Sequence, residues 1–230
     1  MIQLKILKKK IIIFHSNHSY EILLIALLFH LYGSVFFTDL HFYGTYVRII
    51  NTIILYFAST NSFFQRKNKI SQTNKIIIFT TLFLNLSLLL FDGNQVLKVI
   101  REFSYLIFLS LILYNTAVFL FSPHRLDKAL ISASISGYLL IIEIAVRTFM
   151  IFYQSNKNHI LSNIDFSYHT NTFIDTVYFC TVTITSIGYG DVLPISHNAK
   201  MATSLLGLTG QFYLVIIMGI MVSKFISKEK

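Results

Sequence analysis

Tryptophan is absent from this chain of 230 residues, cysteine occurs once and proline only twice. The single cysteine, Cys180, excludes a disulfide bond within the chain, and no His and Cys residues cluster as they would in a zinc site. Charged residues are also scarce, at 13% of the sequence, whereas a soluble domain carries about 25%. Hydrophobic residues make up 54%. This composition excludes an ordinary soluble domain and favours a membrane protein.

The charge that is present has mostly one sign, with a net value of +9. A basic chain can bind nucleic acid, but here the Lys and Arg residues lie in short clusters between apolar runs, as topology determinants of membrane proteins do. We therefore expect membrane lipids, and no nucleic acid, as partners. No catalytic constellation is visible, so we expect neither an enzyme nor a cofactor.

Six apolar segments are each close to the length that a helix needs to cross a bilayer, so they predict an all-α membrane protein. The second segment is the weakest because it is short and contains Arg48, whose side chain we expect to reach the membrane interface. A further apolar stretch at 173–184 is too short to span and predicts a re-entrant helix. The six segments are 20–37, 45–60, 76–91, 104–121, 130–153 and 200–223.

Most basic residues fall on one side of these segments: near the N-terminus, between the second and third segments, between the fourth and fifth, and at the end of the chain. The positive-inside rule then places both termini in the cytoplasm. We expect no cytoplasmic ligand-binding domain after the last segment. The opposite side carries only Lys98, Arg101, Lys157 and Lys200.

The residues from Thr183 to Asp191 read Thr-Ile-Thr-Ser-Ile-Gly-Tyr-Gly-Asp. Two glycines separated by one residue allow positive φ angles, which a row of carbonyl groups aimed at one axis requires. The motif resembles the selectivity filter of the potassium channel family, in which four such loops replace the hydration shell of K⁺ with backbone carbonyls. Family members usually have Thr where this chain has Ser186, so the hydroxyl is kept and a methyl group is lost.

The resemblance implies a site and an assembly. Because one chain supplies one filter loop, it implies a homotetramer. It also implies that Asp191 supports the filter. The charge distribution independently predicts that Asp191 faces outward. Two residues further, Leu193 stands where the family often has an aromatic residue or Thr. The filter would consist of Ser186, Ile187, Gly188, Tyr189 and Gly190, with K⁺ bound by the backbone carbonyls of the first four.

The flanking sequence also resembles the family's pore unit, with an outer helix, a pore helix, the filter and an inner helix between residues 130 and 223. Tyr178 corresponds to the position that often hydrogen-bonds the filter Asp, and Tyr178 with Phe179 would form an aromatic cuff; simple packing is the alternative. Gly210 corresponds to a gating hinge, and the alternative is close helix packing. For Gly207 and Gly219 we expect packing.

The four segments before the pore unit resemble the voltage sensor of voltage-gated relatives without its charges. Lys98 and Arg101 keep the spacing of gating charges, but Ser104 and Ile107 follow in the series. Because steep gating needs three or four charges per subunit, we expect weak or absent voltage dependence. In the outer helix, Glu143 and Arg147 stand four residues apart, and we expect a structural ion pair.

The sequence thus predicts a potassium-selective channel that passes K⁺ passively. The alternatives are a less selective cation channel, if Ser186 loosens the filter, and a non-conducting accessory subunit. We expect a cytoplasmic segment 1–19, a four-helix voltage-sensor-like domain 20–121 and a pore domain 122–230. The small size and the Ile-, Asn- and Lys-rich usage suggest a bacterial inner membrane.

Overall fold

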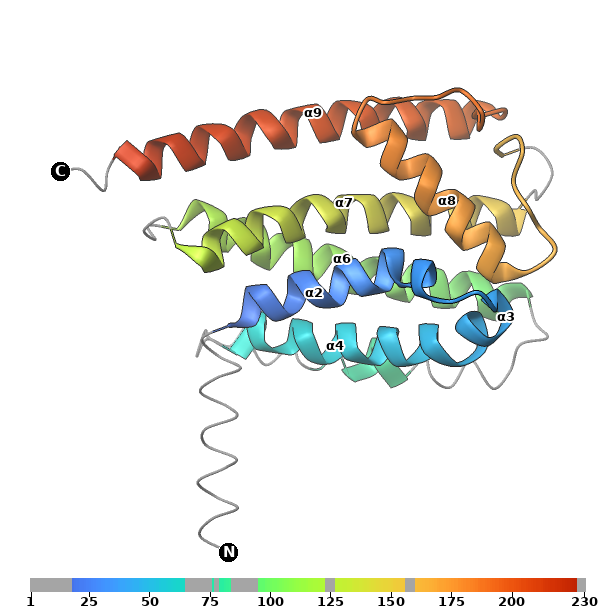
Figure 1. The fold of residues 1–230 in the computed structure, drawn as a ribbon, viewed down its shortest axis with the longest axis horizontal. Coiled ribbons are helices and arrows are strands. Elements are labelled where there is room, and N and C mark those ends of the chain that lie inside the picture. The colour runs from blue at the N-terminus through green and yellow to red at the C-terminus, as the bar shows by residue number, and fades with distance from the viewer. Residues whose placement is uncertain are drawn as a thin grey trace, which may run out of the picture.

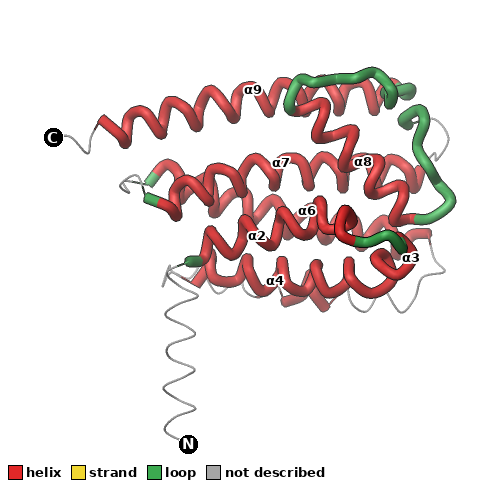
Figure 2. The backbone as a smooth tube through the Cα atoms, viewed as in Figure 1, coloured by secondary structure: helices red, strands yellow, loops and turns green. Residues whose placement is uncertain are grey.

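The computed structural model describes residues 18–64, 76, 79–83, 95–122, 127–155 and 160–226. The described part is helical, and its one isolated β-bridge joins Leu161 to Pro194. Figures 1 and 2 show long helices lying side by side, with α8 inclined across them. The helical elements are α2 (Ser19–Tyr32), η1 (Gly33–Phe36), α3 (Leu40–Phe42), η2 (Tyr43–Val47), α4 (Arg48–Phe64), α6 (Gln95–Phe121), α7 (Lys128–Ser155), α8 (His169–Ile184) and α9 (His197–Ile226).

Among the described residues, four helical stretches are long and apolar enough to cross a membrane. They correspond to the first, fourth, fifth and sixth predicted segments. The second predicted segment forms α4, whose 17 residues begin with Arg48. Most of the third predicted segment, 76–91, lies outside the described residues. The expectation that six helices span the membrane therefore stays a prediction. The four stretches are Ser19–Phe36, Val96–Phe121, Lys128–Gln154 and His197–Ile226.

Local polar contacts set where several of these helices begin. The Asp39 carboxylate accepts hydrogen bonds from the backbone N–H groups of His41 and Phe42, at 2.9 and 3.0 Å, and so caps α3. The chain then continues through the π-helical turn η2 into α4. Asp127 caps α7 in the same way, because its Oδ1 accepts from the Leu130 N–H at 2.8 Å.

Helix α7 lies at the centre of the molecule and α9 at its edge (Figure 1). Helix α7 contacts α2, α6, α8 and α9. Of the membrane-spanning stretch in α7, 67% is buried within the chain, against 11% for α9. Few residues of the inner helix are therefore buried when a single chain is considered.

An aromatic cluster joins α4 to α6. The rings of Tyr56 and Phe108 stack with centroids 3.8 Å apart, and Tyr105 packs edge-on against Tyr56. All three side chains are buried.

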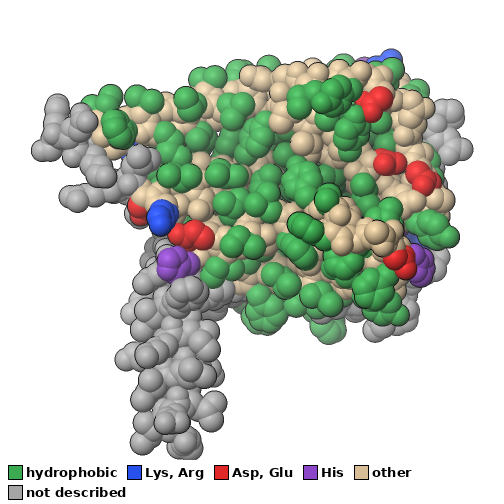
Figure 3. All heavy atoms as spheres, in the orientation of Figure 1, with side chains coloured by type: hydrophobic (Ala, Val, Ile, Leu, Met, Phe, Trp, Pro, Cys, Tyr) green, Lys and Arg blue, Asp and Glu red, His purple; other side chains and the backbone are tan. Residues whose placement is uncertain are grey.

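Figure 3 shows that, on one face, apolar side chains cover the stretch between the two ends of the helices, whereas acidic and basic side chains gather near the ends. This distribution fits a helical bundle embedded in a bilayer.

Candidate ion-conduction site

Helix α8 brings the chain to the filter motif. Phe173, Val177, Cys180 and Ile184 recur at helical spacing and are all nearly inaccessible, so one face of α8 is anchored in the core. The helix begins at His169, four residues before the predicted start, and ends at Ile184. Its direction leads directly into the residues predicted to bind K⁺.

The backbone after α8 turns its N–H groups back toward the helix end. The Ser186 N–H donates to the Thr183 carbonyl at 3.0 Å, and the Ile187 and Gly188 N–H groups both donate to the Val182 carbonyl, at 2.9 and 3.1 Å. The described part contains no cis peptide. Because C=O and the next N–H point in opposite directions across a trans peptide, the carbonyls of Thr185, Ser186 and Ile187 point away from α8.

Backbone angles alternate along the filter motif. The φ angle is +60° at Ser186, +55° at Gly188 and +80° at Gly190, so every second residue has a positive φ. Sequence reasoning expected this freedom only from the glycines and missed Ser186. A non-glycine residue in this region carries a cost of about 1–2 kcal/mol. The Ser186 side chain is held in place, since its Oγ accepts a hydrogen bond from Gln211 Nε2 of α9 at 2.7 Å.

The expected bond between Tyr178 and Asp191 is present. The Tyr178 hydroxyl donates to Asp191 Oδ2 at 2.5 Å. This bond lowers the pKa of Asp191 and raises the pKa of Tyr178 to about 12. Phe179, by contrast, is buried and packs edge-on against Phe149 of α7 with centroids 5.4 Å apart. The two aromatic residues therefore have different roles within one chain.

A short strap ties the outer end of the filter to the segment before α8. Asn163 Nδ2 donates to the Asp191 carbonyl at 2.7 Å. Ser162 and Leu193 exchange two bonds of 2.8 Å, one from the Ser162 N–H to the Leu193 carbonyl and one from the Leu193 N–H to Ser162 Oγ. Nothing in the sequence motif pointed to Ser162 or Asn163. The strap fixes the backbone on the far side of Asp191.

Gly210 of α9 is buried against Ile184, the last residue of α8. A Cβ added to Gly210 would collide with the Ile184 side chain and lie 3.0 Å from its carbonyl oxygen. The structure therefore gives Gly210 a packing role, and its bending during gating stays a prediction. A Cβ added at Gly207 or Gly219 would meet nothing within 4 Å, so the packing expected of these two residues is not found within the single chain.

The predicted ion pair in the outer helix is present and belongs to a larger cluster. Arg147 Nη2 lies 2.6 Å from Glu143 Oε1, and Arg147 Nη1 lies 3.3 Å from Glu102 Oε2 of α6. His30 of α2 contacts Glu143 Oε1 at 3.2 Å through Nε2. Sequence reasoning missed Glu102 and His30, although a carboxylate directly after Arg101 in an apolar helix was a visible signal.

That Arg48 reaches the membrane interface stays a prediction, and the structure shows that its guanidinium also has partners within the protein. Its Nη1 lies 3.1 Å from His169 Nδ1, and its guanidinium lies 5.3 Å from the centre of the Phe173 ring. The side chain thus points inward to the start of α8. The contact brings the start of α4 close to the start of α8.

Comparison with known proteins identifies the C-terminal part of the chain. Residues 138–227, from the middle of α7 to the end of α9, match a family model described as an ion channel. No solved structure matches the chain significantly. The match covers the helices and the loop that carry the geometry described above.

Similar curated proteins are plant two-pore potassium channels. Two-pore potassium channel 4 of Arabidopsis thaliana is 36% identical over 61 residues, which cover 26% of this chain and 22% of the relative. Two-pore potassium channel 3 of the same plant is 34% identical over 74 residues, 32% of this chain and 16% of the relative. Two pore potassium channel b of Oryza sativa subsp. japonica is 38% identical over 55 residues, 24% and 15% respectively.

These matches support the resemblance of the C-terminal part of the chain to the potassium channel family. Together with the four apolar helical stretches, the matches point to a membrane channel rather than an enzyme. The chain spans about a fifth of the length of the curated relatives it matches.

Proposed function

We propose that this protein is a potassium-selective channel that passes K⁺ passively down its electrochemical gradient. The observation that carries the proposal is the backbone of the filter motif, with positive φ at Ser186, Gly188 and Gly190 and with N–H groups turned to α8. That arrangement supports coordination of K⁺ by the carbonyls of Ser186, Ile187, Gly188 and Tyr189. No resident cofactor enters the proposal.

Fourfold assembly is part of the proposal. In the single chain Ile187 and Tyr189 are 53% and 71% exposed, although α8, which leads into the motif, has one face anchored in the core. The inner helix α9 is apolar and mostly uncovered, as a helix that packs against neighbouring subunits and lipid would be. A homotetramer with four converging loops would close the ring of carbonyls.

We further propose that voltage has little influence on this channel. Lys98 and Arg101 are the only charged side chains of α6 at the spacing of gating charges, and Arg101 lies 3.5 Å from Glu102. Moving one charge through the membrane potential is worth about 2.3 kcal/mol per 100 mV, so two outer charges give a shallow response. Both termini would be cytoplasmic, from the distribution of basic residues. The relatives are plant proteins, and a bacterial inner membrane remains a prediction from composition.

The test is single-channel recording of the purified protein in bilayers with K⁺ on one side and Na⁺ on the other. We expect a reversal potential far from zero, set by K⁺. Gly190→Ala should abolish the selective current, because φ of +80° suits glycine and not an L-residue. Gly219→Ala, at a helical position where an added Cβ meets nothing within 4 Å in the single chain, is the matched control and should keep the ion preference.

Two other outcomes correspond to the alternative functions. A reversal potential near zero would favour a less selective cation channel, for which Ser186 in place of Thr is the specific reason. Absence of any flux from liposomes that contain the correctly folded protein would favour a non-conducting accessory subunit.

A further inference from the structure

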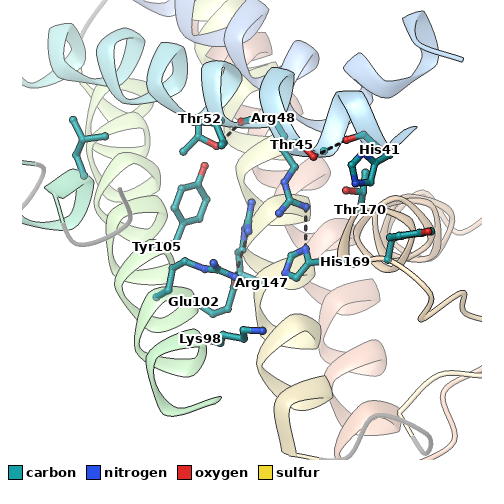
Figure 4. Close-up of a pocket in the computed structure, with 15 residues that line it drawn as sticks. His41, Thr45, Arg48, Thr52, Lys98, Glu102, Tyr105, Arg147, His169 and Thr170 are labelled. Atoms are coloured by element: carbon teal, nitrogen blue, oxygen red, sulfur yellow. Dashed lines mark hydrogen bonds and ion pairs between the residues drawn. The ribbon is translucent and has the colours of Figure 1, made fainter. Parts of the chain in front are cut away.

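A cavity of about 460 Å³ lies between α4, α6, α7 and the first residues of α8, at the end of the bundle where α8 and α9 begin. Four basic side chains line it, and among the described lining residues the only carboxylate is Glu102. Figure 4 shows that Arg48, Arg147 and Lys98 reach into the same space from three different helices. The pore proposed above does not use this cavity.

Two of the basic side chains have carboxylate partners. Arg147 contacts Glu143 at 2.6 Å and Glu102 at 3.3 Å, and Arg101 contacts Glu102 at 3.5 Å. Both carboxylates are therefore already engaged by these two arginines, which leaves neither of them to balance a further cation.

Arg48 differs from Arg101 and Arg147. Within the described part of the chain no carboxylate lies at ion-pair distance from its guanidinium, whose polar partner is His169 Nδ1 at 3.1 Å. Burial and the surrounding arginines hold the pKa of His169 well below its usual range, so the imidazole is neutral and accepts this bond. A cation kept inside a protein without a counter-charge is costly. An anion in the cavity would remove that cost.

The second nitrogen of His169, a residue that lines the cavity, is an unsatisfied donor. Because Nδ1 accepts from Arg48, the proton of the neutral ring is on Nε2. Nε2 is buried and has no hydrogen-bond partner. An unsatisfied buried donor beside an uncompensated guanidinium indicates a missing acceptor.

The start of α8 adds a third feature of the same sign. Tyr168 occupies the N-cap position without a side-chain cap, and Tyr168, His169 and Thr170 all line the cavity. The first N–H groups of a helix and its dipole favour an anion there. The donors thus come from Arg48, from His169 and from the beginning of the helix.

We propose that this cavity binds an oxyanion, namely a phosphate group that is either free in solution or the headgroup of an anionic phospholipid. Arg48 supplies the charge and the forked donor that suits phosphate oxygens. Since the guanidinium groups of Arg48 and Arg147 each lie 5.3 Å from the ring of Phe173, the bound anion would also hold the first turns of α8, the helix that leads to the filter.

Binding can be measured without conduction, as a rise in the thermal unfolding midpoint of the full chain in detergent. In the first arm, inorganic phosphate is titrated into the detergent sample, and chloride at the same ionic strength is the control. In the second arm, the unfolding midpoint is measured in bilayers of phosphatidylglycerol and compared with the midpoint in bilayers of phosphatidylcholine. We expect a saturable rise in at least one arm. A rise with phosphate alone assigns a free anion, and a rise with phosphatidylglycerol assigns a lipid headgroup. No rise in either arm would overturn the proposal.

Variants locate the effect. Arg48→Gln should weaken the apparent affinity by about tenfold or more, since a charge-assisted bidentate contact is lost. Lys200→Gln removes one charge from an exposed residue of α9 outside the cavity and should change nothing. Thr45 is exposed and lines the cavity, so Thr45→Glu should supply a tethered carboxylate and abolish the response, whereas Thr45→Gln should keep it.

The two Thr45 variants test the proposal even if Arg48→Gln does not fold. The rise in the unfolding midpoint is measured within each variant, and the two substituted side chains have similar size. Equal loss in Thr45→Gln and Thr45→Glu, or equal loss in Lys200→Gln and Arg48→Gln, would show that the response is not produced by charge in this cavity and would refute the proposal.

Discussion

Gly210 of the inner helix lies directly against Ile184, the last residue of the pore helix, whose carbonyl oxygen also accepts a hydrogen bond from the Tyr138 hydroxyl of α7 at 3.1 Å. Three helices of the pore unit therefore meet at one residue that stands two positions before Ser186. We therefore expect a shift of α9 at this contact to be felt at the base of the filter motif, because closely packed interiors transmit strain.

Gly210→Ala should lower the open probability without changing ion preference. The added methyl group collides with the Ile184 side chain, and overpacking of this kind typically costs about 1–3 kcal/mol. Single-channel recording gives the open probability, and the reversal potential gives the ion preference. Gly207→Ala, where a Cβ would meet nothing within 4 Å, is the control and should behave as the wild type.

A second substitution separates packing from bending. Ile184→Ala removes the side-chain atoms that the new methyl group meets, while the carbonyl oxygen at 3.0 Å remains, so the double variant should recover in part if collision is the cause. A backbone hinge would not be restored by that change. Failure of Ile184→Ala to rescue Gly210→Ala would therefore contradict the packing explanation and favour the hinge.

The sequence allowed the pore unit to be anticipated because its features are local. Gly188 and Gly190 predict positive φ angles at their own positions, and the apolar stretch 173–184 predicts a helix that leads to them. The positive φ at Ser186 was not predicted, and the bond that its side chain accepts from Gln211 comes from a residue that is distant in the chain. Local patterns do not contain such contacts.

The charged cluster shows the same limit. The pair of Glu143 and Arg147 follows from helical spacing, and the structure confirms it. The contacts of that pair with His30 and Glu102 depend on how α2, α6 and α7 pack, which no spacing within one helix reveals. The contact of Arg48 with His169 was missed for the same reason, since it joins two helices that are distant in the chain.

Tyr178→Phe should make the channel sensitive to weaker acid. The bond from Tyr178 lowers the pKa of Asp191 below that of an unfolded Asp, so its stabilising contribution is complete above the ordinary value of about 4 and is lost as pH falls through the lowered value. Without the hydroxyl, the Asp191 pKa should rise, and the acid-induced loss of K⁺ current should move to higher external pH.

Current recorded against external pH checks this expectation. Between neutral pH and about pH 5, the Tyr178–Asp191 pair should cause no change in the wild-type current. Tyr46→Phe removes a hydroxyl from an exposed residue away from the filter and is the matched control. An unchanged acid profile in Tyr178→Phe would mean that the pair does not support the filter.

Voltage should change the open probability only shallowly over a range of about 100 mV on either side of zero. Replacing Lys98 and Arg101 together by Gln should leave the slope nearly unchanged, because Ser104 and Ile107 interrupt the series of gating charges. The side chains of Lys98 and Arg101 also line the proposed anion cavity, so the double substitution can shift the overall open probability while the slope of its voltage dependence stays the same. A steep conductance–voltage curve that flattens in the double variant would reverse the interpretation.

Leu193→Tyr should strengthen block by external tetraethylammonium by about tenfold, because four aromatic faces would then contact one cation. Leu193 is 54% exposed, and its backbone is fixed by the two bonds to Ser162, so a ring at this position would stand at the mouth of the filter. Ile195→Tyr introduces the same ring two residues later and should give little gain. Mixed expression of wild type and Leu193→Tyr should produce intermediate levels of block, as expected for tetramers with different numbers of rings. Strong block of the wild type, or no gain from Leu193→Tyr, would show that Leu193 does not face the entrance.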